Sequence, residues 1–295
     1  NPSALKENAR LAILGEKGSY SYFAGKKYFA RRSRECVEIG CKSFLDVIKK
    51  VEEKDADYGV LPFENSASGS INEVYDHLQH TQLHIVGEIT ETIEHNLLVC
   101  AETTIDDIQT LYAHPQVFAQ CSYMLTELDN VEVKPCDNTS AAMRKVQTLQ
   151  SSNVAAIGPA QGGRYYDLSP IQSNLMHQNQ NHSRFIIVAR DSIKVPLQIP
   201  AKTTLIMSTV QTPGALVDAL LVLKNHQIAL TKLESRPTPG NPWEEMFYVD
   251  MHGNITDGPM QDALAELSSM TKYLKVLGCY PIESVAPTRI SVAEQ

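Results

Sequence analysis

Residues 11–22 read LAILGEKGSYSY, and this stretch decides the fold of the N-terminal part of the chain. The four aliphatic residues 11–14 predict a β-strand, a turn bounded by two glycines follows, and a helix is expected from Ser19 onward. Between Ala9 and Gly163 similar aliphatic runs alternate with amphipathic stretches. This alternation is typical of βαβ units around largely parallel sheets, so an α/β fold is expected.

Further along, local signals mark more elements of this kind. Ser43, with Asp46 three residues later and an apolar i, i+3, i+4, i+7 stripe, predicts a capped helix, and Ser70 to Glu73 has the form of a capping box. A second βα series is expected from strands at 111–113, 131–133 and 154–157, with helices over 115–128 and from 139 onward.

Residues 184–189 form a solitary strand pattern after this second series. If that strand returns to the first unit, the chain forms two α/β lobes joined by two connections. A ligand is then expected in the cleft between the lobes, where the carboxyl ends of strands converge.

Pro196 and Pro200 interrupt a segment without clear periodicity, which predicts a linker over residues 191–202. The remainder has a βαββαβ pattern that matches a ferredoxin-like domain. Because one such sheet exposes its edges and one face, pairing with a second copy of the chain is expected. The elements predicted here are strands at 204–208, 229–235, 246–250 and 275–279 and helices at 214–224 and 260–273.

Composition narrows the class of partner. The formal net charge is −8, and the longest basic cluster is residues 31–34, which argues against nucleic acid or an anionic membrane and favours a small molecule. The six cysteines form no Cys-x-x-Cys pair and are expected to be reduced and mostly buried. No apolar run reaches the roughly 18 residues of a membrane span, and residues 1–10 lack a secretory core, so a cytoplasmic address is expected.

Six polar segments all lie where a predicted strand ends and a helix begins, or where the returning strand starts. Gly15 to Tyr22 could bind an anion at a helix start or form a plain capped turn, and the same alternatives hold for the loop 62–71 with its three serines. The other four segments are residues 114–121, 138–142, 158–163 and 181–185.

Two residue patterns within these segments are more informative. If residues 181–185 are extended, Ser183 and Phe185 point to one face and could meet one ligand, which leaves Arg184 to an ion pair on the other face. His114 could shuttle protons or be a satisfied structural histidine, and the second is favoured because no carboxylate partner is visible. His77, His80 and His84 superficially resemble a metal site. Only the first two share a helical turn, however, and no third ligand is identifiable.

In this order, the segments resemble the prephenate dehydratase family over essentially residues 10–285. The C-terminal runs 214–217 and 234–237, closed by residues 277–281, resemble the phenylalanine-binding motifs and the ending of that family's ACT domain. The resemblance implies a catalytic domain with two lobes, similar to a type II periplasmic binding protein, followed by the ferredoxin-like ACT domain. It also implies conversion of prephenate to phenylpyruvate without a metal or organic cofactor, with inhibition by L-phenylalanine.

The resemblance also implies roles for particular residues. Ser183 would donate the key hydroxyl, Asn65 and Gln120 would position the substrate, and Phe185 would shape the ring pocket. Further substrate contacts are expected from Ser19, Tyr20, Glu64, Ser66, Ser68, Ser70, His114, Thr139, Ser140, Gly162 and Arg184. Allosteric phenylalanine is expected between a helix start and a facing wall across a subunit interface, formed by Gly214, Ala215, Leu216 and Val217 and by Glu234, Ser235, Arg236 and Pro237.

Two positions depart from the family pattern. Threonine is usual where this chain has Ser183, so the hydroxyl is kept and a methyl worth roughly 0.8 kcal/mol is lost. Because removal of a well-placed donor costs roughly 2.7 to 4 kcal/mol, activity is expected to be retained. Ala113 stands where some relatives carry serine, which removes any hydroxyl role there.

The domain boundaries expected from this resemblance are a linker remnant at 1–9, a catalytic domain at 10–190, a linker at 191–202, an ACT domain at 203–285 and a tail at 286–295. Within the catalytic domain, lobe one is expected over about 10–85 plus 172–190 and lobe two over about 86–171. The first residues resemble the junction after a chorismate mutase domain, so this chain is expected to be part of a bifunctional polypeptide and to lack mutase activity itself.

Three rival interpretations remain open. Arogenate dehydratase acts on an amino instead of a keto substrate, and the fold also suits a non-catalytic solute sensor. The ACT region could be a dimerisation module without a ligand. A homodimer or homotetramer is expected in each case.

Overall fold

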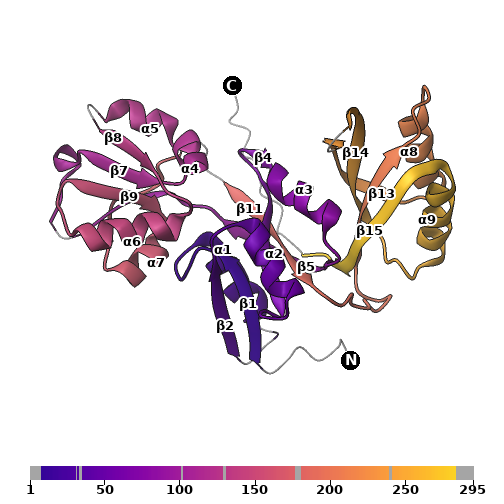
Figure 1. Ribbon diagram of the computed structural model, residues 1–295, viewed down its shortest axis with the longest axis horizontal. Coiled ribbons are helices and arrows are strands. Elements are labelled where there is room, and N and C mark those ends of the chain that lie inside the picture. Colours follow the sequence, from indigo (N-terminus) through magenta and orange to yellow (C-terminus); the bar gives the residue numbers. More distant parts are fainter. Residues whose placement is uncertain are drawn as a thin grey trace, which may run out of the picture.

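The computed structural model describes residues 8–30, 32, 35–100, 102–128, 131–176, 181–238 and 241–283. The predicted tail and residues 1–7 of the predicted linker remnant lie outside these ranges. The described residues form three sheets, which follow one another as three bodies along the long axis of the molecule (Figure 1). Within these ranges, no helix has the length and apolar character needed to cross a membrane. Four of the six cysteines are buried, in line with the prediction that most of them are.

The first sheet has the strand order β2-β1-β3-β11-β5, with the short β4 beside β3. β1 runs parallel to β2 and β3, whereas β11 runs antiparallel to both of its neighbours. The strands are β1 (Asn8–Leu14), β2 (Glu35–Cys41), β3 (Tyr58–Asn65), β4 (Gly69–Ser70), β5 (His84–Thr92) and β11 (His182–Ala189). The helices of this lobe are α1 (Tyr20–Phe29), α2 (Phe44–Glu52) and α3 (Asn72–His80).

The second sheet repeats this plan in the order β8-β7-β9-β6-β10, with a parallel trio followed by an antiparallel strand. Its strands are β6 (Asn96–Val99), β7 (Thr110–Ala113), β8 (Glu132–Pro135), β9 (Val154–Gly158) and β10 (Ser169–Gln172). Its helices are α4 (Pro115–Gln120), α5 (Ser122–Glu127), α6 (Thr139–Leu149) and α7 (Ala160–Gly163), with 3-10 turns η1 (Ile105–Asp107) and η2 (Arg164–Tyr166).

Two connections join the lobes, as the returning strand predicted. The chain leaves lobe one after β5 and re-enters it at β11, which lies between β3 and β5. The boundary expected near residue 85 is too early, because β5 continues to Thr92 and pairs with β11 along its whole length. The hydropathy pattern could not mark this boundary, since polar and apolar residues alternate from β5 into β6 without a break.

Several local predictions can be compared with the helices themselves. Ser43 caps α2 by accepting a hydrogen bond from the Asp46 amide, as predicted. The capping box at Ser70 is wrong, because Ser70 lies in β4 and its hydroxyl instead donates to Glu234 of the C-terminal domain. The helix expected over residues 115–128 is divided at Cys121 into α4 and α5. β2 and β10 were not predicted.

The C-terminal domain has the antiparallel order β13-β14-β12-β15 of a ferredoxin-like fold, as predicted. Apolar residues of α8 and α9 pack on one face of this sheet. The elements are β12 (Ala201–Thr209), α8 (Ala215–Asn225), β13 (Ala229–Thr238), β14 (Asn241–His252), α9 (Gly258–Met270) and β15 (Thr271–Pro281). Residues 271–273, expected in the last helix, belong to β15.

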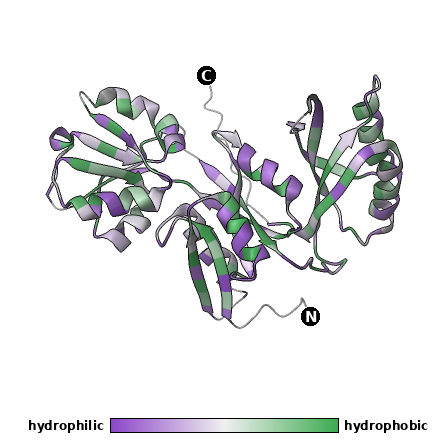
Figure 2. Ribbon diagram, viewed as in Figure 1, coloured by the Kyte–Doolittle hydropathy of each residue, from purple (hydrophilic) through white to green (hydrophobic). Residues whose placement is uncertain are grey.

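The other face of this sheet is covered by lobe one, which corrects the expectation that it is exposed. Ile206, Tyr248 and Leu277 belong to the same buried cluster as residues of β3, α2 and α3. The Tyr75 ring of α3 stacks on the Phe63 ring. It also packs edge-to-face on the Tyr248 ring, with 4.7 Å between the two ring centroids. In Figure 2, hydrophobic residues are prominent in the strands of both bodies. The C-terminal domain is therefore seated on lobe one by a shared core.

Gly278 allows the closest approach between the two domains. A Cβ at this position would overlap the Ile85 carbonyl oxygen of β5, so β15 can lie against β5 only without a side chain there. Gly258, at the first turn of α9, offers a matched comparison, because a Cβ there would meet no atom within 4 Å.

We predict that Gly278→Ala lowers the free energy of unfolding by about 1–3 kcal/mol, because overpacking forces the backbones apart. Urea denaturation measures this change. Gly258→Ala is the control and is expected to leave stability unchanged or slightly raised. Equal stability of the two variants would contradict the close approach.

Candidate active site

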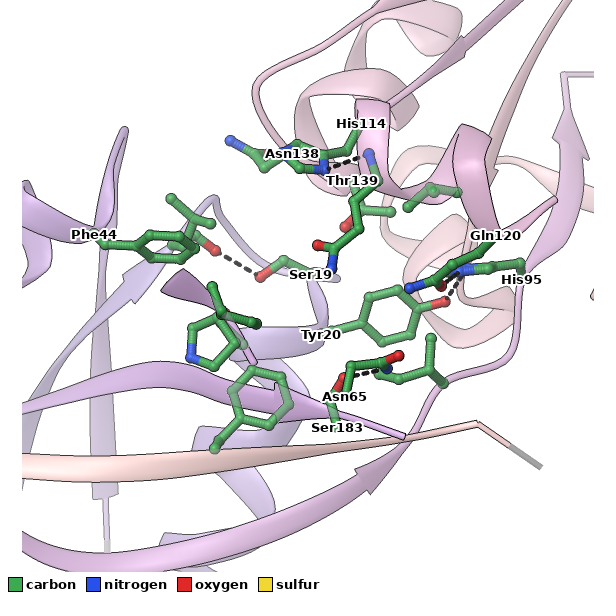
Figure 3. Close-up of a pocket in the computed structure, with 18 residues that line it drawn as sticks. Ser19, Tyr20, Phe44, Asn65, His95, His114, Gln120, Asn138, Thr139 and Ser183 are labelled. Carbon is green, nitrogen blue, oxygen red and sulfur yellow. Dashed lines mark hydrogen bonds between the residues drawn. The ribbon is translucent and has the colours of Figure 1, made fainter. Parts of the chain in front are cut away.

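One pocket lies between the two lobes and is lined by residues from both (Figure 3). Of the residues predicted from sequence, it includes Ser19, Tyr20, Asn65, His114, Gln120, Thr139, Ser183 and Phe185. An apolar wall is formed by Leu14, Phe44, Pro62, Ile71, Ile93 and Val117. No lysine, arginine, aspartate or glutamate is among the described residues that line it. The polar groups that the pocket offers to an anion are therefore amides, hydroxyls and the imidazoles of His95 and His114.

The floor of the pocket is formed by the neighbouring strands β3 and β11. Asn65 pairs with Ser183 in the antiparallel register, and the Asn65 Nδ2 donates to the Ser183 Oγ at 2.9 Å. The other end of the Asn65 side chain accepts from the Ala67 and Ser68 amides at 2.9 and 3.0 Å. These bonds fix the orientation of the Asn65 amide. Since the Ser183 oxygen accepts the bond, its own hydrogen can be donated into the pocket.

A second polar group connects the lobes through His95, which sequence reasoning missed. The His95 Nε2 lies 2.7 Å from the Gln120 Oε1, and the His95 Nδ1 lies 2.9 Å from the Tyr20 hydroxyl. Because the Gln120 Oε1 can only accept, His95 Nε2 carries the hydrogen, and the Gln120 NH₂ is turned the other way, toward Ser68 at 3.5 Å. His95 belongs to the interlobe connection, where no motif marks it.

Burial lowers the pKa of His95, although its hydrogen bond to Gln120 acts in the opposite direction. Burial also lowers the pKa of His114. The His114 Nδ1 accepts from the Gln116 amide at 3.2 Å and so caps α4. The structural role favoured for His114 is therefore confirmed, and its ring also lines the pocket.

Several helices begin at the pocket, among them α1 of lobe one and α6 of lobe two. Ser19 caps α1, accepting from the Tyr22 amide and donating to the Leu14 carbonyl, so its hydroxyl is already engaged. Asn138, which sequence reasoning did not list as a site residue, caps α6 by accepting from the Ala141 amide. The first-turn amides of a helix lack partners within that helix and carry partial positive charge. The starts of α1 and α6 thus offer an anion one site in each lobe.

Serine side chains close the rim where lobe one meets α4. The Ser68 hydroxyl donates to the Asn65 Oδ1 at 3.1 Å and accepts from the Gln116 Nε2 at 2.8 Å. Ser66 instead accepts from the His182 amide at 2.9 Å, which ties the loop to β11. Neither serine lines the pocket itself.

Five other predicted substrate contacts lie outside the pocket. Glu64, Ser70 and Arg184 face the C-terminal domain, because side chains alternate along β3 and β11. Ser140 accepts from the Glu16 amide at 2.9 Å and so joins the two lobes. Gly162 packs against the backbone of Gly18, where a side chain would not fit. These five residues therefore do not line this pocket, whereas the ion pair predicted for Arg184 on the other face of the strand is confirmed.

The predicted allosteric residues fall into two separate places. Gly214, Ala215, Leu216 and Val217 line a second cavity together with residues 208–213 and Glu244, Glu245 and Phe247. The β13 residues 234–237 are not part of this cavity. Arg236 forms an ion pair with Asp76 of α3 at 2.8 Å, and Glu234 accepts from the Ser70 hydroxyl at 2.8 Å. Within one chain, β13 therefore contacts lobe one instead of the cavity.

Comparison with known proteins identifies the family. Residues 11–193 match the family model described as prephenate dehydratase. The bifunctional chorismate mutase/prephenate dehydratase of Enterobacter agglomerans is 54% identical over 279 residues, which cover 95% of this chain and 72% of that protein. The chain belongs to the prephenate dehydratase family. An Arabidopsis thaliana relative named arogenate dehydratase/prephenate dehydratase 2, chloroplastic, is more distant, at 33% identity over 93% of this chain and 72% of its own length.

Solved structures extend the likeness to the whole fold. The prephenate dehydratase of Arthrobacter aurescens in complex with L-Phe superposes with a TM-score of 0.82 at 25% identity, covering 96% of this chain and 93% of that one. GqqA, described as a novel type of quorum quenching acylase, superposes with a TM-score of 0.80 at 28% identity, covering 93% and 98%. The predicted fold class, a two-lobed catalytic domain followed by an ACT domain, is confirmed.

The lowered pKa of His95 in this prephenate dehydratase family member has a consequence for stability. The unfolded chain binds the imidazole proton more readily than the folded chain. The free energy of unfolding therefore falls as the pH drops below the unfolded pKa of about 6.5, and this loss levels off below the folded-state pKa.

We predict that His95→Gln loses less of its free energy of unfolding than the unaltered chain between about pH 7.5 and about pH 5.5. Urea denaturation at the two pH values measures the difference. Some pH dependence of the unfolding free energy is expected to remain in His95→Gln, since burial also lowers the pKa of His114. An identical loss in both proteins would contradict a buried neutral imidazole.

Proposed function

We propose that this chain converts prephenate to phenylpyruvate with loss of water and carbon dioxide, and that the Ser183 hydroxyl assists the departing ring oxygen. The Asn65–Ser183 hydrogen bond supports this proposal above all. It lies at the floor of a pocket without charged side chains among its described lining residues, and it leaves the serine hydrogen available to a ligand.

The two carboxylates of prephenate match the two helix starts. One carboxylate binds at the first turn of α1, beside Tyr20, and the other at the first turn of α6, beside Thr139. Helix N-termini attract anions through free amides and the helix dipole, each interaction being worth roughly 0.3–1 kcal/mol and more where partly buried. Because the two helices belong to different lobes, bound prephenate holds the cleft closed.

The reaction breaks two bonds and is driven by aromatisation. The carbon–carbon bond to the ring carboxylate breaks and releases carbon dioxide. Its electron pair enters the ring, and the carbon–oxygen bond to the ring hydroxyl breaks. The leaving oxygen takes a proton and departs as water.

Hydrogen bonding from Ser183 stabilises negative charge on the leaving oxygen as that charge develops. A serine hydroxyl is a poor acid at neutral pH, so it supplies a hydrogen bond while solvent completes the proton transfer. Phe185, 2% exposed, and Phe44 form an apolar surface for the ring and favour loss of the charged carboxylate as neutral carbon dioxide.

We predict that Ser183→Ala lowers kcat on prephenate by about 10²–10³-fold, because one donor to the developing oxyanion is lost. Ser183→Thr keeps the hydroxyl and is expected to stay within about fourfold of the unaltered chain. Formation of phenylpyruvate measures both. Full activity of the alanine variant would overturn the role of this hydroxyl.

The same assay separates the rival functions. Incubation with arogenate in place of prephenate shows whether the amino substrate is also accepted, and phenylalanine would be its product. We expect the larger kcat/KM with prephenate. A chain that binds prephenate but forms no product would be a sensor, and that result would overturn the dehydratase proposal.

We further propose that L-phenylalanine binds in the cavity at the start of α8 and lowers activity. Gly214 precedes α8 with φ of +86°, and Leu216 and Val217, whose first-turn amides have no partner within the helix, line the cavity. These amides suit the amino-acid carboxylate, while Glu244 and Glu245 suit its ammonium group. Phe247 is available to pack on the aromatic ring.

We predict that Gly214→Ala weakens L-phenylalanine binding by about tenfold, because the left-handed backbone there is strained by a side chain. Isothermal titration calorimetry measures binding, and the uninhibited kcat is expected to stay within about twofold. Gly258→Ala, a glycine-to-alanine change at the other helix start of the domain, is the control and is expected to bind normally. Equal affinity of both variants would contradict this location.

A further inference from the structure

A cluster of six charged residues lies between lobe one and the C-terminal domain, and we name it the seam cluster. Lobe one contributes Glu64, Glu88 and Arg184, and the C-terminal domain contributes Lys202, Lys232 and Asp250. None of these residues lines the pocket between the lobes. The proposed reaction therefore leaves them unexplained.

Arg184 lies at the centre of this cluster. Its guanidinium donates to Asp250 at 2.6 Å, to Glu88 at 2.8 Å and to Glu64 at 3.1 Å. Its remaining Nη2 donates to the Tyr280 hydroxyl at 2.9 Å. Two of these four partners, Asp250 and Tyr280, belong to the C-terminal domain. The position of Arg184 is thus set jointly by both domains.

Each domain supplies partners for the charges of the other, because Lys202 and Lys232 contact Glu88 and Glu64, and Asp250 contacts Arg184. Lobe one supplies two carboxylates and one cation, whereas the C-terminal domain supplies two cations and one carboxylate. Burial alone would raise the pKa of Glu64, but the hydrogen bond from Lys232 and the charge of Arg184 outweigh it, and the pKa is lowered. Asp250 and Glu88 are only 2% and 4% exposed, so neither can exchange its partner for water without a large penalty.

The seam cluster is attached directly to the floor of the active site. Ser183 faces Asn65 in the strand register, and the next pair is Arg184 facing Glu64. Because side chains alternate along a strand, the first pair points into the pocket and the second into the seam. The register shifts between Arg184 and Phe185, so regular pairing alone does not fix the backbone here.

We propose that Arg184 and Asp250 are positioning residues for the reaction, through which the C-terminal domain holds the Ser183 hydroxyl at the correct angle and distance for the leaving oxygen. This inference rests on the proposed role of Ser183. A hydroxyl without the β-methyl of threonine rotates more freely, so its placement depends more on the backbone that carries it.

A second interdomain ion pair provides a matched control. Arg236 of β13 and Asp76 of α3 also join lobe one to the C-terminal domain, at 2.8 Å, but neither residue adjoins Ser183 or Asn65. Asp76→Asn therefore weakens the contact between the two domains without disturbing the pairing of β3 with β11 beneath the pocket.

The first experiment compares Asp250→Asn with Asp76→Asn in steady-state kinetics on prephenate without phenylalanine. Asparagine at 250 can still accept from Thr204, as Asp250 does at 2.7 Å, but it loses the charge that holds Arg184. We expect Asp250→Asn to lower kcat by about tenfold or more with KM changed by less than about threefold, since misplacement of a group acting on the transition state lowers kcat. Asp76→Asn is expected to stay within about twofold in both constants.

A double-mutant cycle separates positioning from general destabilisation. If Asp250 acts through the Ser183 hydroxyl, Asp250→Asn lowers the residual turnover of Ser183→Ala by less than about twofold. Losses that multiply would overturn the inference. Full turnover of Ser183→Ala alone would overturn the proposed function of the hydroxyl instead, so the two failures are distinguishable.

Tyr280→Phe tests the same inference if Asp250→Asn does not fold. This change removes only the hydroxyl that contacts Arg184 and Thr204 and leaves the buried ring in place. It is expected to lower kcat by about three- to tenfold, again with little change in KM. Normal kcat in folded Tyr280→Phe would overturn the inference.

Discussion

The antiparallel pairing of β3 with β11 is the constraint on which the rest of the structure depends. These strands are far apart in the chain, and their register places Asn65 beside Ser183, 118 residues later, and Glu64 beside Arg184. β11 can reach this position only if the chain completes the whole of lobe two and then returns. One strand pair thereby closes the two-lobed fold, forms the floor of the cleft and attaches the C-terminal domain.

The β3–β11 pair carries its charged side chains on the face opposite the pocket, and this arrangement suits the proposed chemistry. An arginine within the pocket would bind the ring carboxylate of prephenate strongly, and that ground-state stabilisation would oppose its loss as carbon dioxide. Arg184 is adjacent in sequence to Ser183, yet its charge is directed to Glu88 and Asp250 on the other face. Helix starts, amides and hydroxyls remain to hold the substrate, and these bind anions without a neutralising ion pair.

The C-terminal domain packs closely against lobe one and supplies part of its buried core. Tyr248 packs on Tyr75, its hydroxyl donates to the Tyr75 carbonyl, and Gly278 lies against β5. Three kinds of interaction therefore connect the domains: an apolar core, a close backbone contact and a buried set of charges. A ligand that bound unequally to two arrangements of this domain would shift the strands beneath the active site.

The sequence by itself determined the α/β class, the return of β11, the ferredoxin-like domain and the polar residues of the cleft, because these follow from periodicity, caps and the resemblance of short motifs. The alternation of Ser183 and Phe185 against Arg184 was also predictable from the period of a strand. Tertiary structure alone decided that Glu64 and Ser70 contact the C-terminal domain, that Arg184 finds its partners there, and that His95 contacts Gln120. Those outcomes depend on which surface covers each face of a strand, and residues distant in sequence supply that surface.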